Sequence, residues 1–221
     1  METQRHPWLA TFFLSIWLFI VVGTSFVLRR GSLDVFIVNQ TAASVSLILI
    51  SLSLVLGPLG KFFNVFDLFV SRRKELGIWG FIFAYIHILL IVFALRERFP
   101  WSRFADFPLS FIAGIVALVL LCFLTLITPL RAMKMMGPHV WRKALRYASY
   151  SALLAILLHS WEFGHVRWLS WIEKPQPAVP PIGSIVFLIG VVVFLVRCYT
   201  WLYDMLHKKK APVNTNGVRL P

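Results

Sequence analysis

The sequence predicts an all-α polytopic membrane protein, a bundle of six transmembrane helices. Its 221 residues are 59% hydrophobic and only 14% charged, whereas a soluble domain is about half apolar and about a quarter charged. Apolar stretches of about 20 residues recur, the length that crosses a hydrocarbon core of about 30 Å as a helix. These stretches are continuous and lack the alternation of barrel strands, which favours helices.

The predicted spans cover residues 8–28, 41–60, 76–95, 109–130, 144–162 and 182–206. The first run ends at Arg29 and Arg30 without a small-residue cleavage site, so we expect a membrane helix and not a cleaved signal. We therefore expect one domain over residues 1–206. A basic, disordered cytoplasmic tail is expected over residues 207–221. The proline-rich segment 175–181 predicts a stiff linker.

Basic residues set the predicted orientation. Fifteen Lys and Arg fall in the N-terminus, in the 61–75 and 131–146 loops and from Arg197 onward, and the other three loops hold seven. The positive-inside rule therefore predicts that both termini are cytoplasmic. Despite the net charge of +13, these cations lie at the ends of apolar helices, so membrane lipid and not nucleic acid is the expected partner.

Two histidines, His87 and His159, lie inside predicted spans. Ionisable groups in hydrocarbon are costly and therefore favour a functional role, with a hydrogen-bonded packing role as the alternative. His87 lies ten residues past Gly77 and His159 twelve past Tyr147, which is about 15 Å and about 18 Å along their helices. Two imidazoles at similar depth in the outer half of the bilayer suit bis-axial ligation of haem iron.

Small residues accompany both histidines. Gly80 and Ala84 precede His87, and further small residues precede His159 at helical spacing: Ala148, Ala152 and Ala155. A flat porphyrin needs small facing side chains, although small residues also let helices pack closely. Together with the histidine pair, they favour haem b as the cofactor.

Three stretches resemble the ferric reductase-like transmembrane family in their order and spacing. The first is LGPL at residues 56–59, and the second is RRKELGIW at residues 72–79, followed by His87. The third begins with Leu124-Thr125 and continues through Met136-Gly137 and Trp141 to His159. The resemblance covers about 40–165. Within that family the chain is most similar to the haem-binding membrane subunit that feeds electrons to a periplasmic methionine sulfoxide reductase. It implies a six-helix haem b protein that moves electrons across a membrane, with His87 and His159 as metal ligands.

One position departs from that pattern. Those related subunits have a further histidine where this chain has Arg146, and an arginine is always protonated and cannot serve as an ordinary haem ligand. The resemblance therefore gives no clear basis for a second, inner haem. Arg142 and Arg146 are instead candidates to clamp a flavin phosphate, of FMN or FAD, or haem propionates; orientation and lipid contact are the alternative.

Other polar residues give weaker indications. Glu162 and His165 lie near the outer mouth and could meet a substrate metal or a partner, or simply form a solvated loop. No GxGxxG or GxxxxGK phosphate loop occurs in the sequence, so a nucleotide-binding domain would come from a partner. No catalytic residue is predicted.

The resulting hypothesis is an electron-transfer subunit. A cytoplasmic flavin or flavin reductase would be the donor, and a periplasmic reductase subunit or ferric iron the acceptor. Two alternatives stay open: a small transporter or channel, and a non-redox membrane scaffold in which the histidines only pack.

Overall fold

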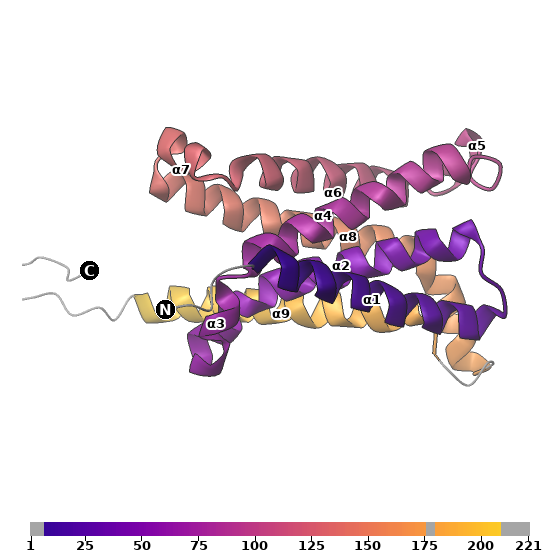
Figure 1. The fold of residues 1–221 in the computed structure, drawn as a ribbon, viewed down its shortest axis with the longest axis horizontal. Helices are drawn as coiled ribbons and strands as arrows, with labels where there is room; N and C mark the ends of the chain where they lie inside the picture. The colour runs from indigo at the N-terminus through magenta and orange to yellow at the C-terminus, as the bar shows by residue number, and fades with distance from the viewer. Residues whose placement is uncertain (1–6, 176–179, 209–221) are drawn as a thin grey trace, which may run out of the picture.

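The computed structural model describes residues 7–175 and 180–208, and these residues form helices and no strand (Figure 1). The predicted tail beyond 208 and most of the predicted linker, residues 176–179, lie outside the described residues. Long helices make up most of the fold: α1 (Pro7–Arg30), α2 (Val35–Phe62), α4 (Arg73–Leu89), α6 (Pro108–Ile127), α8 (Pro138–Glu173) and α9 (Ile182–Lys208).

Short helical segments connect the long helices. They are η1 (Asn64–Phe66), α3 (Asp67–Val70), α5 (Trp101–Asp106) and α7 (Leu130–Met136). A π-helical turn, η2 (Leu90–Ala94), continues α4, and the amide of Leu95 donates to the carbonyl of Leu90 at 2.9 Å. Helices η1 and α3 expose large apolar side chains, among them Val65, Leu68 and Phe69.

The helices begin where the sequence supplies a stop or a cap. Asp34 accepts a hydrogen bond from the amide of Ile37 at 2.8 Å and caps α2. Prolines occupy the first positions of α6 and α8, where no intrahelical amide bond is lost. Gly137 precedes α8 with φ +76°, a conformation that favours glycine.

Five helices are long and apolar enough to cross a membrane: α1, α2, α4 with η2, α6 and α9. They coincide with five of the six predicted spans, so the prediction of a multi-pass α-helical membrane protein is confirmed at this level. The remaining predicted span lies within α8, which does not meet the same criteria. Only 15 residues separate Arg146 from Glu162, fewer than the roughly 20 that a spanning segment needs.

Helix α2 lies at the centre of the bundle and packs against α4, α9 and α1, while α6 packs against α8. Small residues permit the closest approach. A Cβ on Gly80 would lie 2.7 Å from Cγ1 of Ile50, so α4 meets α2 without a side chain at this point. Ser46 on α2 donates to the carbonyl of Gly80 at 2.8 Å, which joins the two helices inside the apolar core.

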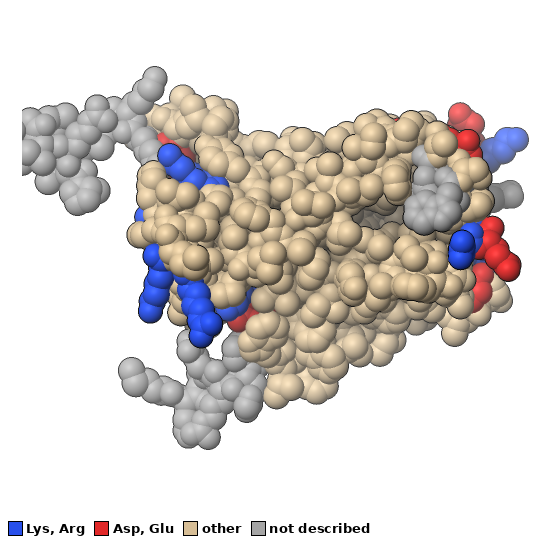
Figure 2. All heavy atoms as spheres, turned by 90° about the horizontal axis from the view of Figure 1, so that it is seen from above, with Lys and Arg blue, Asp and Glu red and all other residues tan. Residues whose placement is uncertain are grey.

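The bundle has two ends, which we name by the short helices found there. The α3 end also carries α7 and the C-terminal end of α9, and the α5 end lies opposite (Figure 1). Between them the surface seen in Figure 2 is almost free of charged side chains, which gather at the ends, and many large apolar side chains of the long helices are exposed. Lys and Arg predominate at the α3 end of this face, whereas both signs occur at the α5 end. A hydrophobic belt between polar ends is the surface expected of a protein embedded in lipid.

Candidate functional site

A cavity of about 1020 Å³ lies near the α5 end, between α2, α4, α6 and α8. Both His87 and His159 line it, together with mainly apolar side chains. Its volume is at the upper end of the range for small-molecule and cofactor sites, about 300–1,000 Å³. The surface in Figure 2 is also hollowed near this end of the bundle.

His87 lies in the last turn of α4, directly before the π turn. Its Nδ1 is 3.3 Å from the backbone carbonyl of Asn39, near the start of α2. A carbonyl only accepts, so this contact assigns the proton to Nδ1 and leaves Nε2 with a free lone pair. A neutral imidazole held in this tautomer is the form that binds a metal.

His159 is held in the same way from the other side. Its Nδ1 donates to the carbonyl of Ser110 at 2.8 Å and lies 3.0 Å from the Ser110 hydroxyl, in the first turn of α6. The hydroxyl itself donates to the carbonyl of His159 at 3.2 Å. One turn further along α6, a Cβ on Gly114 would lie 3.0 Å from Nδ1 of His159, so the glycine provides the space for the ring.

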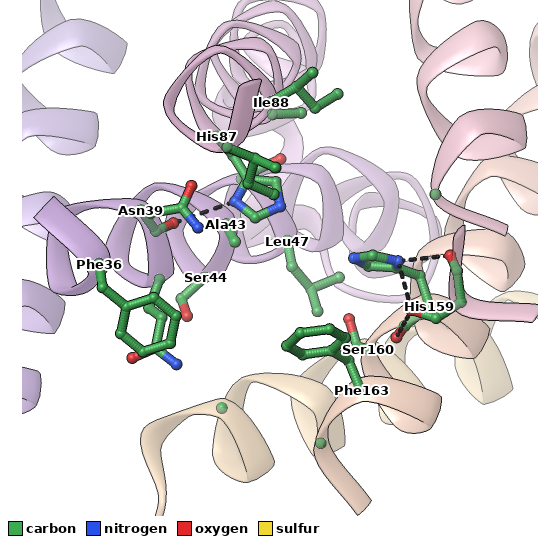
Figure 3. A pocket seen from close by; sticks show the side chains of 18 of the residues that line it. Phe36, Asn39, Ala43, Ser44, Leu47, His87, Ile88, His159, Ser160 and Phe163 are labelled. Carbon is green, nitrogen blue, oxygen red and sulfur yellow. Dashed lines mark hydrogen bonds between the residues drawn. The ribbon is translucent and has the colours of Figure 1, made fainter. Parts of the chain in front are cut away.

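The two imidazoles therefore approach the cavity from helices α4 and α8. In Figure 3 each ring turns its hydrogen-bonded nitrogen toward the wall and its other nitrogen toward the cavity, so that the two free nitrogens face one another. Among the described residues, no group of three or more His, Cys, Asp or Glu side chains comes together. The pair therefore fits a metal that brings its remaining ligands with it, as haem iron does.

A ring of arginines lies at the rim of the cavity. Its members come from the end of α1, the segment after η2 and the outer part of α8: Arg29, Arg30, Arg96, Arg98 and Arg167. The described lining residues include no Asp or Glu. Arg30 pairs with Asp34 at 3.3 Å, and burial and the neighbouring charge of Arg98 lower the pKa of Arg167. A carboxylate or phosphate would be favoured at this rim.

Aromatic side chains support that rim. The guanidinium of Arg98 lies 3.8 Å from the centre of the Phe36 ring, a cation–π contact. A smaller hollow of about 320 Å³ is lined by Arg98, Arg167 and four phenylalanines: Phe36, Phe99, Phe107 and Phe163. The ring of Phe163 is also stacked on that of His159, with centres 6.4 Å apart. Aromatic packing thus extends from His159 to the rim.

One polar atom in the cavity wall has no partner. Oδ1 of Asn39 is buried without a hydrogen bond, in a residue that is only 3% exposed. An unpaired buried acceptor costs about 1–3 kcal/mol, so such atoms point to water or a ligand as the missing partner. Because Asn39 lines the cavity, a bound molecule could supply that partner.

Some predicted site residues lie elsewhere. Arg142 and Arg146 are exposed on α8 and do not line the cavity. Other arginines line this cavity. The proposed contact of Arg142 and Arg146 with a flavin phosphate or with haem propionates stays a prediction.

The expectation that the small residues before each histidine face the cofactor is corrected in part. Of the predicted small residues only Ala84 lines the cavity. Gly80 packs against Ile50, and the three predicted alanines of α8, Ala148, Ala152 and Ala155, are buried without lining it. Helix packing explains their size. The small residues that do line the cavity include Ala43, Ser44 and Gly114. They are far from both histidines in the sequence, so the sequence did not indicate that they lie beside them.

His165 and Glu162 are also outside the cavity lining. Nδ1 of His165 lies 3.0 Å from the carbonyl of Trp161, one turn earlier in α8, and its ring stacks on that of Trp161 at 5.4 Å. These are local contacts within one helix.

Sequence reasoning assigned no binding role to the rim arginines. A signal was present, because six of the seven basic residues in the outer loops are Arg and only one is Lys. Guanidinium groups bind carboxylates and phosphates in a bidentate manner.

Comparison with models of protein families gives no match, and no curated protein is similar enough to count as a relative. Functional conclusions for this chain therefore depend on its own residues and geometry.

Proposed function

We propose that this chain is a haem b electron-transfer protein of the membrane, with His87 and His159 as the two axial ligands. The observation that carries the proposal is the opposed pair of imidazoles in one apolar cavity, each with its free nitrogen turned inward. Haem iron bound by four porphyrin nitrogens leaves two positions, one on each face, and two histidines can fill them.

The surrounding residues fit this group. The carbonyls of Asn39 and Ser110 fix the tautomer and direction of the two imidazoles, as carbonyls that accept from metal-bound histidines do in other proteins. The rim arginines suit the two propionates, because a guanidinium binds a carboxylate through paired hydrogen bonds. The apolar wall excludes water and so influences the reduction potential.

Bound in this cavity, a haem supplies a one-electron couple. The proposed donor is a cytoplasmic flavin or flavin reductase, and the proposed acceptor is a reductase subunit or ferric iron on the outer side. We further propose six spans, with α8 as the sixth, because its 36 residues continue as one helix well beyond its short uncharged centre in both directions. Both termini would then be cytoplasmic in a bacterial inner membrane, since the more basic α3 end carries the end of α9.

A difference spectrum of the purified protein tests the proposal. Reduction with dithionite is expected to give a b-type haem spectrum at one haem per chain. His87→Ala and His159→Ala are each expected to abolish it, since each removes an axial ligand. His165→Ala is the matched control, because that histidine lies outside the cavity lining and its loss should leave the spectrum unchanged.

A colourless but folded protein would contradict the proposal and favour a transporter or a scaffold. So would a spectrum that survives in both His87→Ala and His159→Ala. Thermal unfolding of each variant in detergent separates loss of haem from loss of fold.

A further inference from the structure

A second polar cluster lies inside the bundle near the α3 end, and it does not depend on the haem proposal. It consists of Arg73 at the start of α4 and Arg197 on α9, with Tyr150 of α8 beside them. His87 lies 14 residues beyond Arg73, about 21 Å further along the axis of α4. Neither arginine lines the cavity of the histidines.

The guanidinium of Arg73 is fixed by the neighbouring helix. Its Nε donates to the carbonyl of Ser53 at 3.0 Å, and the Ser53 hydroxyl donates to the carbonyl of Arg73 at 2.6 Å. The first bond holds the Arg73 side chain against α2, and the second ties the Arg73 backbone to the same residue, Ser53, which is partly buried. The terminal NH groups of Arg73 are left to bind something else.

Arg197 is held by an aromatic ring. Its Cζ lies 4.7 Å from the centre of the Tyr150 ring, and its Nε is buried without a hydrogen bond. Arg197 lies seven residues before Asp204, so it is about 10 Å further from the end of α9 than the Lys61–Asp204 ion pair. An arginine at this depth in an apolar helix indicates a functional site by default.

The two guanidinium groups converge on one point. A Cβ on Gly57 would lie 2.9 Å from one terminal nitrogen of Arg73 and 3.2 Å from one of Arg197. No acidic residue in the described ranges pairs with Arg73 or Arg197. Partly buried like charges repel strongly unless an anion compensates them.

We infer that this cluster binds a phosphate group through Arg73 and Arg197, whose guanidinium groups come together beside Gly57. A phosphate has several free oxygens and can accept hydrogen bonds from two guanidinium groups at once. A carboxylate has only two oxygens, and one bidentate guanidinium engages both. The site lies in an apolar helix bundle near a basic end, so the phosphate can belong to an anionic phospholipid or to a soluble phosphate compound.

Binding to the purified, delipidated full chain tests the inference in two arms. Phosphatidylglycerol, with phosphatidylcholine for comparison, is counted per chain by native mass spectrometry. Radiolabelled inorganic phosphate is measured by equilibrium dialysis. One phosphatidylglycerol per chain without retained phosphate assigns the site to lipid, and the reverse assigns it to a soluble phosphate.

Three variants decide whether the cluster is responsible. Arg197→Gln is expected to weaken binding about tenfold or more, since a hydrogen bond to a charged group contributes about 1.5–3 kcal/mol. Gly57→Ala keeps every charge but fills the point of convergence, and it should also weaken binding. Arg131→Gln, an exposed arginine on α7 at the same end, removes the same charge and should bind as the unaltered protein does.

The inference is overturned if neither probe binds, or if Arg197→Gln and Arg131→Gln have equal effects. If Arg197→Gln does not fold, Arg197→Lys takes its place, because it keeps the charge and removes the planar fork; unchanged binding in both Arg197→Lys and Gly57→Ala then overturns the inference. Haem content is recorded in every sample. A protein that binds haem but no phosphate refutes only this inference, and one that binds phosphate but no haem refutes only the proposed function.

Discussion

Gly114 allows the imidazole of His159 to take its place in the cavity wall, and Gly114→Ala tests how closely the ring is fitted. The added Cβ would lie 3.0 Å from Nδ1 and 3.3 Å from Cε1 of His159, a few tenths of an ångström inside an ordinary contact. Overpacking of this kind costs about 1–3 kcal/mol. Because the ring moves with its ligating nitrogen, we expect haem to be retained about 5- to 150-fold less tightly.

The assay is the rate of haem loss from the purified protein to an excess of apomyoglobin. Gly183→Ala is the control, since it adds the same methyl group to the same cavity at 3.6 Å from the nearest atom. Both changes replace a helical glycine by alanine. The gain in helix stability of up to about 1 kcal/mol is therefore shared and does not affect the comparison. Equal rates of haem loss in the two variants would refute the reasoning about ring position.

Two further predictions concern contacts between helices. Ser110→Ala should weaken haem retention by about 0.5–1.5 kcal/mol, or less than about 15-fold in the haem-loss assay, because the Ser110 carbonyl still accepts from His159 at 2.8 Å; complete loss of haem would contradict this. Gly80→Ala should lower the free energy of unfolding by about 1–3 kcal/mol, measured in detergent, because its Cβ would meet Ile50 at 2.7 Å. Gly23→Ala, whose nearest neighbour would be at 3.4 Å, is the control and should cause no such loss.

Hydropathy was sufficient to predict most of the fold. Continuous apolar runs bounded by charges and prolines correspond to α1, α2, α4 with η2, α6 and α9 within three residues, except that α2 begins six residues before its predicted span. Helix α8 was harder, because its 36 residues extend beyond its apolar centre in both directions. The predicted span 144–162 corresponds to that centre. The ends of the helix depend on Gly137 and on local capping, which hydropathy does not show.

The candidate site was predicted only in part, for a physical reason. His87 and His159 could be found because an ionisable side chain in an apolar run is conspicuous, and helical rise gives its depth. Asn39, Ser110 and Gly114 could not be found, because their roles depend on which helices are neighbours and on how each is rotated. Hydropathy gives neither the neighbours nor the rotation.

The π turn after His87 has a consequence for evolution and engineering. One wide turn is equivalent to a single extra residue in an α-helix, so a one-residue deletion within 90–94 can restore regular winding without disturbing the histidine upstream. The segment that follows would then rotate by about 100° around the axis and carry Arg96 and Arg98 away from their present direction. The length of this turn thus sets the angle between His87 and the rim arginines, and an insertion or deletion here would change the direction of the rim without exchanging a side chain.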